Sequence, residues 1–236
     1  MMGGFARISN GHERWKCGAR IPRHRHDLAY VALVLSGSYE ECGSRGRFRV
    51  RAGDVLLHDA FDAHLNCFQS GGAQILNLVL ADMPAGSGIG RVANPDAIWR
   101  AAERDDTEAG IHLRAQLREV RRISYDWPDE LARDLLADPN CRLDAWAHAH
   151  RLAPETVSRS FGKVFGVTPA SFRLEARTRR AFAMITNGEA PFAMIAAITG
   201  FSDQAHMSRA VLALTGAPPG HWRRSNRFKT ECACAA

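Results

Sequence analysis

Two stretches in the second half of the chain decide its fold: LAPETVSRSFGKVFGVTPASFRLEARTRRA (152–181) and IAAITGFSDQAHMSRAVLALTGAPPGHWR (195–223). In the first stretch, Val157, Phe161 and Phe165 recur every four residues, which predicts a helix with one apolar face. Short helices are expected before and after a tight turn in each region, and in the first region the earlier helix covers residues 145–150. This pattern predicts two helix-turn-helix units.

Helix start and stop signals frame these units. We expect Asp144 to cap a helix over 145–150, Ser202 to cap the second helix of the second unit, and Gly216 to end it. Thr168 and Pro169 begin a long helix between the units. About 19 residues at 1.5 Å each make a rod of roughly 28 Å, close to the ~34 Å between successive major-groove faces of DNA.

The segments FGKVFGVTP, GFSDQAHMSR and PPGHWR resemble the DNA-binding domain of AraC/XylS-type transcription regulators, and the resemblance covers residues 128–227. It implies that two recognition helices present side chains to double-stranded promoter DNA. The side chains implied are Glu155, Thr156, Ser158, Arg159, Lys163, Ala205, His206 and Arg209. Arg159 and Arg209 are the strongest candidates for base or phosphate contacts. The sequence departs from the family pattern at Met207 and Val211, where phenylalanine is usual.

The first third of the chain is rich in short strand signals. Residues 30–36 are aliphatic and β-branched, and further strands are expected at 64–68 and 74–80. Many short strands with close turns predict an antiparallel barrel or sandwich. The fold class is therefore α+β, an antiparallel β-barrel followed by an all-α domain.

Histidines cluster in this strand region. His24 and His26 are two residues apart, so on a strand both side chains point to the same side. The stretches PRHRHDLAYVALVLSGSY and GRFRVRAGDVLLHDAFDAHLNCF resemble a cupin sensor domain, in which His64 stands at the histidine of the second motif. The glutamate that many metal-binding cupins carry falls here at Tyr30 or its neighbours, and His58 is an extra candidate.

Three histidines can hold a zinc, iron, nickel or manganese ion, because each neutral imidazole offers one lone pair. The predicted ligands are His24, His26 and His64. Two alternatives stay open: the histidines line a metal-free cavity for an organic effector, or they bind nothing.

The middle of the chain joins the two domains. We expect a sensor domain over 1–81, a linker with helices over 82–126, and a DNA-binding domain over 127–236. Asn94 is expected to cap the first linker helix. A helix over 107–123 is predicted to form a homodimer through Leu113 and Leu117, the alternative being that it packs on its own barrel.

Composition excludes several classes of protein. The chain has 236 residues, a net charge of +6 and six cysteines, too few for a disulfide scaffold at this length. No apolar run approaches the ~18–20 residues of a membrane span, and we expect no secretory signal, no membrane partner and a cytoplasmic location. Cys232 and Cys234 form a terminal pair of open significance.

The sequence thus predicts a transcription regulator, not an enzyme, that couples a small-molecule or metal signal in the barrel to promoter binding. The alternatives are a metal-dependent cupin enzyme with an accessory helical domain, and a constitutive DNA-binding protein with a degenerate barrel. The identity of the effector, the operator and the sign of regulation are not encoded in any motif.

Overall fold

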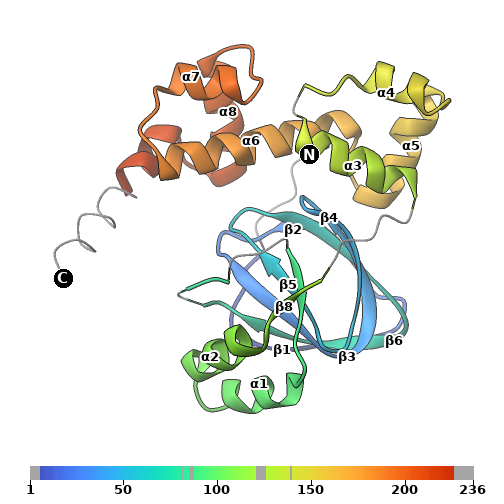
Figure 1. Ribbon diagram of the computed structural model, residues 1–236, viewed down its shortest axis with the longest axis vertical. Coiled ribbons are helices and arrows are strands. Elements are labelled where there is room, and N and C mark those ends of the chain that lie inside the picture. Colours follow the sequence, from blue (N-terminus) through green and yellow to red (C-terminus); the bar gives the residue numbers. More distant parts are fainter. Residues whose placement is uncertain (1–5, 81, 85–87, 121–125, 139, 226–236) are drawn as a thin grey trace. The chain divides into compact units, whose positions relative to one another are not determined.

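The computed structural model describes residues 6–80, 82–84, 88–120, 126–138 and 140–225, and it divides into two compact units (Figure 1). The first consists mainly of the residues up to Asp129 and holds an antiparallel sheet with two helices. The second consists mainly of the residues from Glu130 on and is helical. The predicted succession of an antiparallel sheet domain and an all-α domain is confirmed. Among the described residues, no helix combines the length and apolarity needed to cross a membrane.

Two long strands form the centre of the sheet. The strands are β1 (Gly11–Trp15), β2 (Arg20–Arg25), β3 (Tyr30–Gly43), β4 (Gly46–Arg51), β5 (Asp54–His58), β6 (Ala63–Leu78), β7 (Ile89–Arg91) and β8 (Arg118–Glu119). Their order is β1-β6-β3-β5-β7-β8, with β2 paired to β6 and β4 paired to β3. The separate strands predicted at 64–68 and 74–80 are one strand, β6, and the expected linker contains β7.

The sheet is strongly curved but does not close into the predicted barrel. Strands β1 and β8 stand at the two ends of the path, and no ladder among the described residues joins them. The curvature comes from glycines in β3 and β6: Gly37 and Gly72 both have positive φ, and a Cβ at Gly37 would collide with the carbonyl oxygen of Gly72. Both strands bend at this close approach and contribute to two layers, so the sheet folds over instead of closing.

Both faces of β3 are buried, which explains its uninterrupted apolar run. Val31 and Leu33 face a core that contains residues of helices α1 (Pro95–Ala102) and α2 (Asp106–Gln116), which cover this side of the sheet (Figure 1). Alternate residues such as Ala32 and Val34 face the space between the layers. Because successive side chains of a strand point to opposite faces, a strand buried on both faces needs apolar residues at every position.

The predicted dimer contacts are wrong. Helix α2 ends at Gln116 instead of continuing to 123, and residues 121–123 lie outside the described residues. Leu113 is fully buried in the domain core and the partly buried Leu117 packs against that core, so both side chains contact their own domain. The alternative, packing on the same domain, is what the structure shows. The predicted cap is confirmed, since Asn94 Oδ1 accepts a hydrogen bond from the Ala97 N–H at 3.0 Å.

The helical domain contains two helix-turn-helix units. Its helices are α3 (Trp127–Ala137), α4 (Leu143–Ala149), α5 (Pro154–Phe165), α6 (Pro169–Asn187), α7 (Phe192–Ile198) and α8 (Gln204–Thr215). Helices α4 and α5 form the first unit, α7 and α8 the second, and the 19-residue α6 runs between them (Figure 1). The aromatic residues Phe161, Phe165 and Phe172 fill the first core, and Met207 and Val211 are fully buried in the second.

Most of the predicted helix ends are correct. Thr168 accepts a hydrogen bond from the Ser171 N–H, and Gly216 ends α8 with a positive φ of 78°. Two caps differ from the prediction. Helix α4 begins at Leu143, so that Asp144 lies in its first turn, and the side chain that caps α8 belongs to Asp203 instead of Ser202. The terminal cysteines Cys232 and Cys234 lie outside the described residues.

Candidate functional site

The sheet domain brings the three selected histidines together. His24 lies in β2 and His26 follows directly after it, and the antiparallel register of β2 with β6 sets His24 opposite His64. The ring centroids are 4.3 Å apart for His24 and His64, 5.0 Å for His24 and His26, and 5.6 Å for His26 and His64. Each residue offers one ligand atom, and the three atoms lie within 4.8 Å of one another. A shared metal ion therefore fits the donor set.

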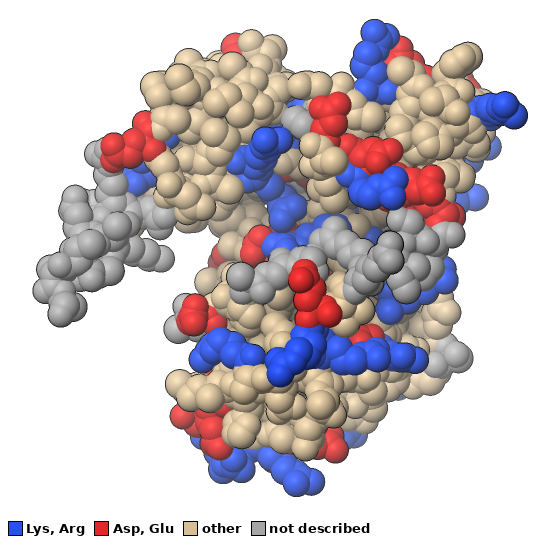
Figure 2. Space-filling view, viewed as in Figure 1, with Lys and Arg blue, Asp and Glu red and all other residues tan. Residues whose placement is uncertain are grey.

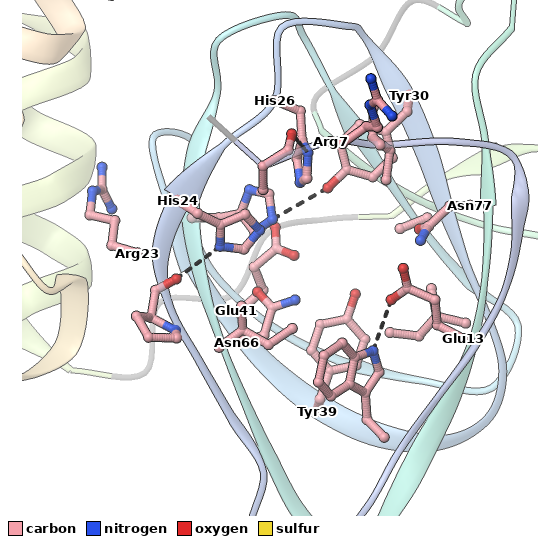
Figure 3. A pocket seen from close by; sticks show the side chains of 18 residues that line it. Arg7, Glu13, Arg23, His24, His26, Tyr30, Tyr39, Glu41, Asn66 and Asn77 are labelled. Atoms are coloured by element: carbon pink, nitrogen blue, oxygen red, sulfur yellow. Dashed lines mark hydrogen bonds between the residues drawn. The ribbon is translucent and has the colours of Figure 1, made fainter. Parts of the chain in front are cut away.

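Hydrogen bonds fix the tautomers of two of these rings (Figure 3). His24 Nδ1 lies 2.8 Å from the Pro22 carbonyl oxygen, and His26 Nδ1 lies 2.7 Å from that of Ala6. A carbonyl oxygen can only accept, so each Nδ1 carries the proton and each Nε2 keeps its lone pair. This arrangement of a backbone carbonyl behind an imidazole is common at metal centres.

Burial keeps the imidazoles neutral. Loss of solvent around the rings lowers the pKa of His24 and His26, and it lowers the pKa of the fully enclosed His64 well below its usual value. Neutral imidazoles bind metal ions, whereas protonated imidazoles do not. The site is thus ready to bind a ligand at neutral pH without first losing protons.

Sequence reasoning missed one acidic residue and underrated a histidine. Glu41 from β3 is 4% exposed, and its carboxylate Oε1 lies 3.6 Å from Nε2 of the equally buried His58. Tyr30, at the expected glutamate position, places its hydroxyl 3.3 Å from His64 Nε2 and stacks on His58. Alternation along β3 could have indicated Glu41, because it follows the buried Tyr39 by two residues and faces the same side.

A cavity of about 400 Å³ opens beside the histidines. One part of its wall is polar and includes His24, His26, His64 and Glu41 (Figure 3). Another part is apolar or aromatic and consists of Trp15, Ile21, Ala32, Tyr39 and Ile75. Trp15 Nε1 donates a hydrogen bond to Glu13 Oε2 at 3.0 Å, which holds the indole in the wall. This combination of an apolar wall with a few convergent polar groups is typical of small-molecule sites.

The first recognition helix presents its predicted side chains to solvent. Helix α5 begins at Pro154 and buries Val157, Phe161 and Phe165, which leaves the other faces free. The exposed side chains are Glu155, Thr156, Ser158, Arg159 and Lys163. None of these side chains is committed to the core.

The second recognition helix differs in charge. Ala205 and Arg209 of α8 are exposed, whereas His206 is half-buried and its Nδ1 lies 3.1 Å from Ser202 Oγ. Gln204, which the sequence analysis did not select, is exposed in the first turn and can pair with a base edge through its amide. On the face shown, the surface over α7 and α8 is mostly uncharged (Figure 2).

The comparisons with known proteins concern mainly this helical domain. Residues 146–225 match the family model of a helix-turn-helix domain, and the match spans both units. The C-terminal part of the chain is therefore a helix-turn-helix domain. No curated protein matches this chain.

Solved structures similar to the chain include a DNA-binding domain in complex with DNA. The DNA-binding domain of AdpA, solved in complex with a target DNA, is 17% identical, covering 44% of this chain and 96% of that chain with a TM-score of 0.42. A probable AraC family transcriptional regulator from Rhodopseudomonas palustris CGA009 is 17% identical, covering 41% and 93% with a TM-score of 0.38. ToxT from Vibrio cholerae strain SCE256, with unsaturated fatty acid bound, is 10% identical, covering 92% and 97% with a TM-score of 0.41.

Proposed function

We propose that the protein is a transcription regulator in which occupancy of the histidine-lined cavity controls binding to promoter DNA. The observation that carries this proposal is a cavity of about 400 Å³, walled by buried neutral imidazoles, in a chain whose other domain is a helix-turn-helix domain. A ligand that binds one conformation of the chain more tightly than another shifts the population toward the conformation that it prefers. If DNA also prefers one conformation, the ligand changes the free energy of DNA binding by the coupling free energy between the two sites.

The signal that best fits the polar wall is a divalent metal ion on His24, His26 and His64. Zinc, nickel, iron and manganese all accept imidazole ligands, and a bound ion would supply a Lewis acid that holds an oxygen-donor ligand in the cavity. The other form of the proposal is a metal-free organic effector, supported by the apolar wall around Trp15 and Tyr39. Metal content and effector response distinguish the two forms.

On DNA, the two recognition helices would enter successive major grooves of double-stranded promoter DNA. The proposed contacts are Glu155, Thr156, Ser158, Arg159, Lys163, Ala205, His206 and Arg209, together with Gln204. Arg159 and Arg209 would pair with guanine edges or phosphates. We also propose that the protein acts in the cytoplasm as a homodimer, through a surface other than Leu113 and Leu117, which pack in their own domain.

A metal-dependent enzyme is the second candidate function, because of Glu41. The sequence offers no carboxylate in the histidine motif, yet the fold brings Glu41 to His58 and His64, which completes a set of two histidines and one carboxylate. Such sets occur in metal-dependent oxygenases. This candidate predicts metal-dependent turnover of a small substrate and no sequence preference on DNA, and the regulator predicts the opposite.

The test of the regulator begins with selection of DNA from a random pool by the full-length protein. Affinity for the selected sequence is then measured by fluorescence anisotropy with metal-loaded and with chelator-treated protein. His26→Ala removes a cavity ligand, and His112→Ala, an exposed histidine on α2, is the matched control.

We expect the wild type and His112→Ala to change their DNA affinity at least fivefold on metal removal, and His26→Ala to show no response. If an organic effector is the signal, metal removal changes nothing and His26→Ala weakens the effector response instead. If selection yields no preferred DNA sequence, the proposal of a sequence-specific regulator is wrong. If DNA affinity is the same with and without metal and with and without an effector, the cavity does not control DNA binding.

A further inference from the structure

A second group of ligating side chains lies behind the cavity wall. Glu41 of β3, His58 at the end of β5 and His64 near the start of β6 offer three ligand atoms within 4.8 Å of one another. The three side chains are 3–4% exposed. They border a small void of about 10 Å³, which is just large enough for one water-sized species.

The strand register builds this group. Tyr30 pairs with His58 across β3 and β5, and Gly43 pairs with His64 across β3 and β6. Glu41 lies two residues before Gly43 on β3, so its side chain reaches the same space. A Cβ at Gly43 would come within 2.7 Å of His64 Cβ, which shows how closely the two strands approach here.

Two buried nitrogen atoms at this void have no hydrogen-bond partner among the described residues. They are His58 Nε2 and His64 Nδ1. A buried polar atom without a partner costs about 1–3 kcal/mol, so a folded protein normally supplies one. The void between these side chains is the place where a partner species fits.

The ligand atoms around the void are of the kinds that bind a metal ion, namely two imidazole nitrogens and a carboxylate oxygen. Glu41 Oε1 lies 3.6 Å from His58 Nε2, so the two side chains are close enough to share one ion. The nearby guanidinium of Arg45 already binds Asp59 and Asp62, which leaves the position beside Glu41 to another cation.

We propose that Glu41, His58 and His64 form a second metal site, which shares only His64 with the cavity histidines and binds one divalent transition-metal ion such as Zn²⁺. Two imidazole nitrogens and one carboxylate oxygen are a ligand set that Zn²⁺ and Co²⁺ accept. Glu41 and His64 line both the void and the large cavity, so an ion reaches the void past these two side chains.

The shared histidine couples the two sites. A neutral imidazole has one lone pair, so His64 can serve an ion in the cavity or an ion in the void, but not both at once. The protein therefore binds one ion tightly per chain, and removal of one ligand group leaves the other able to bind. This inference concerns metal binding alone and does not depend on DNA binding.

The test uses the full-length protein with a His24→Ala/His26→Ala background, which removes the cavity group and leaves the second group intact. The matched triple variant adds His58→Phe, whose ring fills the same space and can still stack on Tyr30. Zn²⁺ stoichiometry is measured by competition with a chromophoric chelator, and melting temperature is measured with and without Zn²⁺. Circular dichroism verifies the fold of each variant.

We expect about one Zn²⁺ per chain and a Zn²⁺-dependent rise in melting temperature for the double variant, and neither for the triple variant. A double variant that binds no Zn²⁺, or a triple variant that still binds one, overturns the proposal. If the alanine pair does not fold, His24→Leu/His26→Leu replaces it, because leucine restores the lost volume without a ligand atom.

Discussion

In the helical domain most candidate side chains lie exposed on single helices, whereas in the sheet domain most are buried and they come from the region of strands β2, β3, β5 and β6. Arg159 and Lys163 are four residues apart on α5, and both point to solvent. His24 and His64 are forty residues apart and meet only through the register of β2 with β6. The first arrangement separates function from stability, and the second ties them together.

The largest expected effect is on the stability of the sheet domain, whose site depends on contacts between distant strands. Gly72 has a φ of 67°, and a Cβ there would collide with the carbonyl oxygen of Trp15. We expect Gly72→Ala to lower the free energy of unfolding by about 2–5 kcal/mol, from a left-handed backbone and an overpacked contact. Urea unfolding of the full-length protein, followed by circular dichroism, measures this loss.

Gly71→Ala is the matched control. Gly71 also has a positive φ, 94°, but a Cβ there meets nothing within 4 Å. Its substitution carries only the backbone cost of about 1–2 kcal/mol. Equal losses for the two variants would mean that the close approach of β6 to β1 does not hold the bend.

The same contrast explains what the sequence could predict. The caps at Asn94 and Thr168 and the stop at Gly216 depend on a few neighbouring residues, and the structure confirms all three. Alternation along β3 can indicate that Glu41 faces inward, but the side chains that it meets there depend on how β3 pairs with β6. Two predicted strands also proved to be one bent strand, because the glycines that look like a turn only redirect it.

The wrong predictions in the helical domain are helix caps that lie one or two residues away from the predicted position. Ser202 and Asp203 are adjacent and both are good caps, so propensity alone does not choose between them. The wrong prediction in the sheet domain has another cause. The sequence predicts Leu113 at a dimer interface, because the apolar face of the sheet that Leu113 covers cannot be seen in the sequence.

An intermediate effect is expected on DNA affinity, when exposed side chains of the helical domain are removed. We expect Arg159→Ala and Arg209→Ala to weaken binding to the selected DNA by about 5–150-fold, equivalent to ~1–3 kcal/mol, if each arginine pairs with a base edge. Neither variant should change the free energy of unfolding, because both side chains are exposed. Anisotropy titrations at several salt concentrations also show whether an arginine contacts phosphate, since the salt slope then falls by about one.

Arg100→Ala controls for loss of positive charge, because Arg100 is exposed on α1 of the sheet domain. If it weakens DNA binding as much as the two variants above, the effect is general electrostatics and the recognition helices are wrongly assigned. If Arg159→Ala alone has an effect, the mostly uncharged second unit contributes little to affinity.

The smallest expected effect concerns a single cap. Asp203 Oδ1 accepts a hydrogen bond from the His206 N–H at 2.7 Å, and this bond lowers the pKa of Asp203. A carboxylate whose pKa is lower in the folded state stabilises the fold above its unfolded pKa of about 3.9, and this contribution is lost as the pH falls through the folded pKa. Asp203→Ala should therefore lower the melting temperature slightly at neutral pH, and the difference from wild type should shrink below about pH 4.

Ser202→Ala is the control, and it should lower the melting temperature less at neutral pH, because Asp203 supplies the cap. If Ser202→Ala lowers the melting temperature more than Asp203→Ala does, Ser202 is the cap in solution, as the sequence predicts.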